Sequence, residues 1–157
     1  MRICLIHSLI VLEIGGGFLG VWTTVSMSRI ARNMSHNYWI LNIPAILLFL
    51  FGIGAGLALV QRPRLGIVLS GVYQALQIPA LLSPLLCYKL QSGLLIGVVW
   101  SQGKVGPWIE FGSTFGFQVF GFKGSALIGI NLLALALFVF ILLELPRINR
   151  SDKKPSK

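Results

Sequence analysis

The chain has 157 residues, of which 55% are hydrophobic and only 11% are charged, whereas soluble domains carry about a quarter charged residues. A mean hydropathy of +0.84 excludes an ordinary water-exposed surface and predicts one compact membrane domain. The net charge of +9 comes mainly from Lys and Arg at the ends of apolar segments, which is typical of membrane topology. We therefore predict a lipid bilayer, and no nucleic acid, as a partner.

Four apolar segments are long enough to predict transmembrane helices. The first is expected to be retained instead of cleaved as a signal peptide, because Glu13 interrupts it and no small-residue cleavage site follows. The third contains Pro79 and Pro84, so a kink is expected there. The predicted helices cover residues 3–25, 39–60, 65–87 and 125–145.

The long connection at residues 88–124 is predicted to form a small cap. It is rich in Gly and Phe, not in polar residues. An apolar run of strand length at Leu94–Trp100 and the alternation of Phe115 and Phe117 predict β-strands, with a turn at residues 102–107. A re-entrant or interfacial segment is the alternative. The aromatic residues expected to make cap contacts are Trp100, Trp108, Phe115, Phe117, Phe120 and Phe122.

Together these elements predict an all-α polytopic membrane protein, a four-transmembrane-helix bundle with a β-containing extracytoplasmic cap. Four spans place both termini on one side, together with Arg62, Arg64 and the basic tail at residues 146–157. The positive-inside rule assigns that side to the cytoplasm. The cap then lies outside a plasma membrane or a bacterial inner membrane.

Glu13 is the strongest candidate for a functional group, because a carboxyl group inside a membrane helix is costly and by default marks a functional site. It shares a helix face with Gly16 and Gly20, a small-residue pair that permits close helix packing. Glu13 should therefore face protein, either as a protonatable or cation-binding carboxylate or as a protonated group bonded to a neighbouring helix. Gly52 and Gly56 form a second packing pair.

The third predicted helix carries a polar stripe beside its prolines. Ser70, Gln74 and Gln77 share one helix face, and Asn131 of the fourth predicted helix is a further candidate for the same network. The stripe predicts either interhelical hydrogen bonds or a polar cavity beside the kink.

In having one membrane carboxylate on the first of four predicted helices, the chain resembles the small multidrug resistance transporters. That resemblance implies exchange of protons and drug cations by a dimer, with Glu13 as the exchanging group. It covers the first helix only, because the segment 88–124 and the kinked third helix depart from the compact plan of that family.

The sequence contains no GxSxG, HExxH, P-loop or GxGxxG motif, and Cys4 and Cys87 lack zinc or redox spacing. We predict a non-catalytic protein without metal or cofactor. It would act as a subunit, assembly factor or scaffold, with a membrane protein or a second copy as partner. The alternative is a small oligomeric transporter or channel that uses Glu13. A cavity between Glu13 and the polar stripe would favour transport, and burial against glycines would favour interaction.

Overall fold

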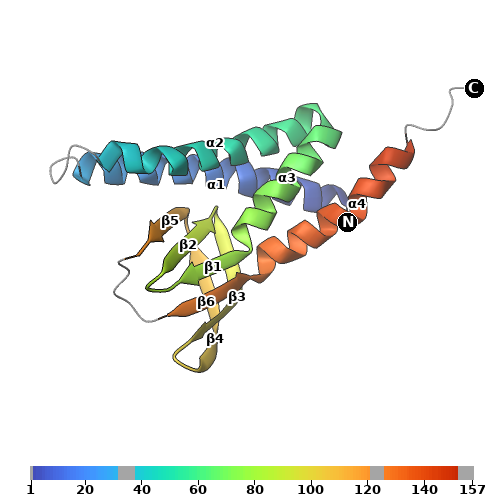
Figure 1. The fold of residues 1–157 in the computed structure, drawn as a ribbon. Coiled ribbons are helices and arrows are strands. Elements are labelled where there is room, and N and C mark those ends of the chain that lie inside the picture. The colour runs from blue at the N-terminus through green and yellow to red at the C-terminus, as the bar shows by residue number, and fades with distance from the viewer. Residues whose placement is uncertain (1, 32–37, 121–125, 152–157) are drawn as a thin grey trace, which may run out of the picture.

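The structure, a computed structural model, describes residues 2–31, 38–120 and 126–151. Within these ranges the chain forms four helices and one six-stranded antiparallel sheet (Figure 1). Three helices precede the strands and one follows them. The helices are α1 (Arg2–Ala31), α2 (Tyr38–Gln61), α3 (Pro63–Gln77) and α4 (Leu132–Ser151).

The prediction of an all-α bundle of four transmembrane helices is wrong. Among the described residues, only α1 and α2 are long and apolar enough to span a membrane, at Cys4–Arg29 and Asn42–Gln61. Helix α3 has 15 residues, and the apolar part of α4 is Leu132–Leu145. Both are shorter than the roughly 17–25 residues that a membrane helix needs. The chain is an α+β protein with two candidate spans.

The prolines explain much of this difference. Pro79 does not kink a helix but is the first residue of β1 (Pro79–Leu82), a position where a sheet tolerates proline. Pro84 lies in the turn to β2 (Leu86–Gln91), which is closed by a 2.9 Å hydrogen bond from Ser83 N to Leu86 O. The segment predicted as one long kinked helix is therefore a short helix followed by a β-hairpin.

The remaining strands are β3 (Leu94–Ser101), β4 (Lys104–Phe111), β5 (Thr114–Val119) and β6 (Leu127–Asn131). Strands β3 and β5 lie where the sequence predicts strands. The predicted turn at 102–107 is shorter in the structure, because only Gln102 and Gly103 have positive φ angles, 51° and 77°. Such a pair makes a two-residue hairpin turn, and the residues after it belong to β4. Residues 127–131 form a strand, where the fourth helix was expected.

The sheet has the order β4-β3-β6-β1-β2-β5, and it curls strongly. On one face, the Trp108 side chain of β4 lies against Gly129 of β6, where a Cβ atom would overlap the indole. Lys89 of β2 lies 4.7 Å above the centre of the Trp108 ring. Its Nζ atom is 2.6 Å from Oε2 of Glu110 on β4. Because three strands separate β2 from β4 in the sheet order, this contact requires the sheet to close on itself partly.

Two cores hold the sheet and the helices together. One is made by apolar side chains from all four helices: Leu9, Leu59, Ile67, Leu137 and Ile141. The other joins Phe49 of α2, Tyr73 of α3 and Leu90 of β2. Figure 1 shows the consequence: the sheet lies beside one half of the α1–α2 hairpin, and α3 and α4 lead from the sheet toward its other half.

Helices α2 and α3 approach most closely at Gly66. A Cβ atom at this position would overlap the backbone of Leu59 and Ala58, and backbone atoms cannot rotate away as a side chain can. The turn between the helices is tight, with Arg62 N donating to Ala58 O at 2.8 Å. The absence of a side chain at Gly66 therefore sets the distance between these two helices.

We expect Gly66→Ala to lower the free energy of unfolding by about 1–3 kcal/mol, the usual cost of inserting atoms into a packed site. The matched control is Gly54→Ala on α2, because a Cβ atom at Gly54 meets no other group within 4 Å. That control should be neutral or stabilising by up to about 1 kcal/mol, since alanine favours helix. Denaturant titration of both variants in detergent measures the difference, and equal stabilities would contradict the close approach.

Candidate functional site

Glu13 is the centre of a buried polar cluster between α1 and α3. Its side chain is 1% exposed. Ser70 Oγ donates to Oε2 of Glu13 at 2.8 Å, and Gln74 Nε2 donates to Oε1 at 3.2 Å. Because Ser70 and Gln74 are one helical turn apart on α3, they reach the same carboxyl group together. The structure thus brings Glu13 into direct contact with two of the three residues of the predicted polar stripe.

The glycines around this cluster allow helices α1, α2 and α3 and the sheet to pack closely. Each glycine lies against a different neighbouring residue. A Cβ atom at Gly56 of α2 would lie 3.3 Å from Glu13 Cβ. Added Cβ atoms at the other three predicted packing glycines would overlap neighbours outside their own helix. Gly16 lies against Ser92 of the β2–β3 turn, Gly20 against Phe49 of α2, and Gly52 against Tyr73 of α3.

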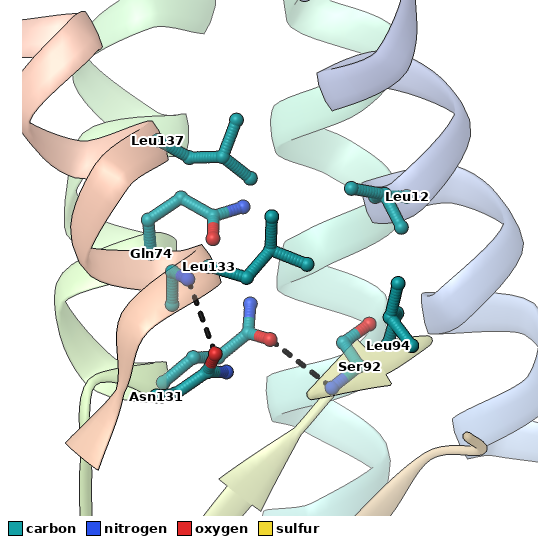
Figure 2. Close-up of a pocket in the computed structure, with 9 residues that line it drawn as sticks. Leu12, Gln74, Ser92, Leu94, Asn131, Leu133 and Leu137 are labelled. Atoms are coloured by element: carbon teal, nitrogen blue, oxygen red, sulfur yellow. Dashed lines mark hydrogen bonds between the residues drawn. The ribbon is translucent and has the colours of Figure 1, made fainter. Parts of the chain in front are cut away.

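A small cavity lies beside the cluster, at the junction of the helices and the sheet (Figure 2). Its polar lining residues are Gln74, Gln77, Ser92 and Asn131, and its volume is about 10 Å³. A cavity needs about 10–15 Å³ to hold one water molecule. Gln74 belongs both to this lining and to the Glu13 cluster, so the buried polar groups form one continuous region.

Two of the lining side chains have clear structural roles. Gln77 Oε1 accepts a hydrogen bond from Ser92 N at 3.1 Å, which ties the end of α3 to the β2–β3 turn. Asn131 Oδ1 accepts one from Ala134 N at 3.2 Å (Figure 2). Asn131 is therefore the N-cap of α4 as well as the last residue of β6.

Three buried polar atoms lack a hydrogen bond of good geometry within the described part of the chain: Tyr73 Oη, Gln91 Oε1 and Ser92 Oγ. The Tyr73 and Ser92 hydroxyl groups nevertheless lie close enough to interact with each other. Buried polar groups are nearly always paired, so each such atom is a position where a small polar ligand or water could bind. Ser92 lines the cavity. A single water molecule in the cavity could therefore supply a partner for Ser92 Oγ.

Ser113 was not among the predicted site residues, yet it attaches the sheet to α1. Its Oγ donates to Gly16 O at 2.6 Å and accepts from Gly93 N at 3.0 Å. Thr23 Oγ1 adds a 3.2 Å contact to the Ser113 carbonyl oxygen. Nothing in the sequence around Ser113 indicates this role, because it depends on the fold bringing residues about 90 positions apart together.

The ion pair between Lys89 and Glu110 was also not predicted from the sequence. Their ion pair lies on the curled inner face of the sheet, where Trp108 Nε1 donates to Glu110 Oε2 at 3.1 Å. The sequence signal was one acidic residue in an apolar segment, but its partner followed only from the curling of the sheet.

The predicted aromatic contacts do not form one cluster. Trp108 lies inside the curl, whereas Trp100, Phe117 and Phe120 are exposed. Phe115 packs against the core shared by α2, α3 and β2. Phe122 lies outside the described residues.

The described residues contain no group of three or more His, Cys, Asp or Glu that could hold a metal ion. The polar cluster can do two things chemically: join α1 to α3, and exchange a proton through a carboxyl group. No family model, curated protein or solved structure matches the chain.

Ser70→Ala should lower the free energy of unfolding by about 1–3 kcal/mol, because it leaves a buried carboxyl oxygen without its donor. Glu13→Met should also destabilise, because it leaves Ser70 and Gln74 without their acceptor. The double variant should lose less than the sum of the two, with a coupling of about 0.5–3 kcal/mol. Ser101→Ala in β3 is the control, and it should add to Glu13→Met without coupling. Additivity of Ser70→Ala with Glu13→Met would contradict the observed contact.

Proposed function

We propose that this chain is an integral membrane protein anchored by the α1–α2 hairpin, and that it acts without catalysis. Its role would be that of a subunit, assembly factor or scaffold of a membrane complex. The burial of the two candidate spans supports the membrane assignment, because only 28% and 33% of their apolar windows are covered by the rest of the protein. A core helix of a soluble protein would be mostly covered. Trp22 of α1, for example, is 71% exposed.

The charges favour one orientation of the hairpin. Helices α1 and α2 are antiparallel, since Asn42 near the start of α2 bonds to Ser28 near the end of α1, whereas Gly56 near the end of α2 lies against Ile14. The N-terminus and the turn with Arg62 and Arg64 therefore share one end. By the positive-inside rule this end would face the cytoplasm. A plasma membrane or bacterial inner membrane fits this arrangement.

The observation that carries the scaffold proposal is the state of the Glu13 side chain. Both carboxyl oxygens accept hydrogen bonds from α3, and the same residue packs against Gly56 of α2. The one acidic group within the candidate spans thus joins three helices. A group used in this way fixes the helix arrangement and leaves the exposed surfaces free to bind a membrane protein or a second copy.

A small oligomeric transporter or channel is the second candidate. It is favoured by Gln74, which connects Glu13 to the polar cavity. A cavity of about 10 Å³ holds at most one water molecule. Conduction through this region would therefore require a second copy or a rearrangement of the helices.

Two Glu13 variants separate these functions. Glu13→Gln keeps one acceptor oxygen, and its NH₂ group can donate to Ser70 Oγ or, after an amide flip, to Gln74 Oε1. Folding and copy number should therefore be unchanged, whereas Glu13→Ala should cost about 1–3 kcal/mol. Native mass spectrometry of detergent-purified protein reports copy number and bound chains. Proton flux into vesicles containing the purified protein reports transport.

The scaffold proposal requires that Glu13→Gln and the wild type behave alike in both measurements. A pH-dependent proton flux in the wild type that Glu13→Gln abolishes would reject the scaffold and favour the transporter. Protein-free vesicles and vesicles containing Ser101→Ala serve as the controls for leakage and for handling.

A further inference from the structure

The two faces of the curled sheet have opposite chemistry. Residues paired directly across antiparallel strands share a face, so the register places Trp100 with Val105 and Ile128 on the outer side. Ile96 and Ile109 are paired on the same side. All of these residues are exposed. The outer face of β3, β4 and β6 is therefore an apolar surface that no described residue covers.

The inner face carries the polar groups. Lys89 and Glu110 form their ion pair there, beside the Trp108 ring. Gln91 Nε2 donates to the backbone oxygens of Glu110 at 3.2 Å and of Gly112 at 3.1 Å. These bonds connect β2 to the end of β4 across the curl. A sheet that faces water on one side buries its apolar face and exposes its polar one, so the pattern here is reversed.

The position of the sheet along the hairpin explains the reversal. The span Asn42–Gln61 of α2 is about 30 Å long, which equals the thickness of the hydrocarbon core. Asn42 Nδ2 donates to Ser28 Oγ at 2.9 Å. Ser28 therefore marks the level on α1 that corresponds to the end of this span.

The sheet is attached to α1 at a level that the neighbouring span of α2 also covers. Ser113 bonds to Gly16 and Thr23, which lie about 18 Å and about 8 Å along α1 from the level of Ser28. If the hairpin crosses the bilayer, these attachments lie within the depth of the hydrocarbon. A sheet attached there cannot stand outside the membrane as a water-exposed cap.

We propose that the outer face of β3, β4 and β6 contacts the acyl chains of the leaflet opposite the Arg62–Arg64 end. This inference rests on the proposed membrane function of the hairpin. The apolar surface continues along the chain, because Ile130 at the end of β6 is followed by exposed Leu132 and Leu135 of α4. Lys104 at the β3–β4 turn is exposed, and its long side chain would bind lipid phosphate groups.

The apolar side chains of this face favour lipid over water. Backbone groups within a bilayer must find partners inside the protein, and the curl brings the Gln91 amide of β2 to the backbone oxygens of Glu110 and Gly112. An apolar exterior around a polar interior is the arrangement found in transmembrane sheets. The sheet would thus be a lipid-embedded part of the protein beside its hairpin.

Tryptophan fluorescence in vesicles of brominated phosphatidylcholine tests this contact, because bromine quenches only indoles that reach the acyl chains. Three full-length variants each keep a single tryptophan, with phenylalanine at the other positions. Trp100 is 45% exposed on the outer face, Trp108 lies within the curl, and Trp22 reports the hairpin. We expect Trp22 and Trp100 to lose most of their fluorescence relative to unbrominated vesicles, and Trp108 to keep most of it.

The outcomes distinguish the lipid contact of the sheet from the membrane insertion of the hairpin. If bromine quenches Trp22 but not Trp100, and aqueous iodide quenches Trp100, the sheet faces water and the lipid contact is rejected while the hairpin stands. If neither quencher reaches Trp100, protein covers this face, which also rejects the lipid contact. If bromine fails to quench Trp22, the membrane proposal itself fails.

A second measurement avoids the loss of Trp108, which could disturb the sheet. Ile109→Cys with Cys4→Ser and Cys87→Ser leaves every tryptophan in place and accepts a nitroxide label at a site that is 74% exposed in the wild type. In vesicles the label should collide more with oxygen than with a water-soluble nickel chelate. The opposite preference would reject the lipid contact.

Discussion

The hydrogen bonds between Glu13 of α1 and the two polar side chains of α3 constrain the rest of this structure. A carboxyl group in so apolar a chain must be paired inside the protein. Ser70 and Gln74 provide that pairing only if their face of α3 is turned toward Glu13, while α3 itself packs mainly against α2 and α4. Gly56 then lets α2 pack against the same residue. Once α3 is fixed in this position, Gln77 at its end reaches Ser92, which places the first hairpin of the sheet against the helices.

The helical stripe of polar residues on α3 could be predicted from the sequence, whereas the fold could not. Ser70, Gln74 and Gln77 are spaced at the helical repeat, and all three lie on α3 in the structure. Residues 79–87 and 127–131 are short apolar runs without periodicity. Such a run is found both in buried strands and in buried helices, so it does not distinguish them. Extending the helices through both runs produced the four-helix bundle, which is wrong. Pro79 was the sequence evidence against extending the third helix, because proline disrupts a helix interior. In the structure Pro79 begins β1.

The parts of the site that the sequence could not predict depend on contacts across the sheet. Lys89 meets Glu110 only because the sheet curls, and Ser113 meets Gly16 only because the β4–β5 connection returns to α1. Neither pair has a local pattern, and each requires the strand order and register to be known. The stripe on α3 needed only the helical repeat, so it was visible from the sequence.

The junction at Asn131 has a mechanical consequence. Asn131 closes β6 and caps α4 at the same time, and its backbone N–H also donates to Ile78 O at 2.9 Å. No loop separates the strand from the helix, so α4 has no hinge at its base. Strand β6 lies between β3 and β1 in the middle of the sheet. A tilt of α4 would therefore be transmitted directly to the centre of the sheet.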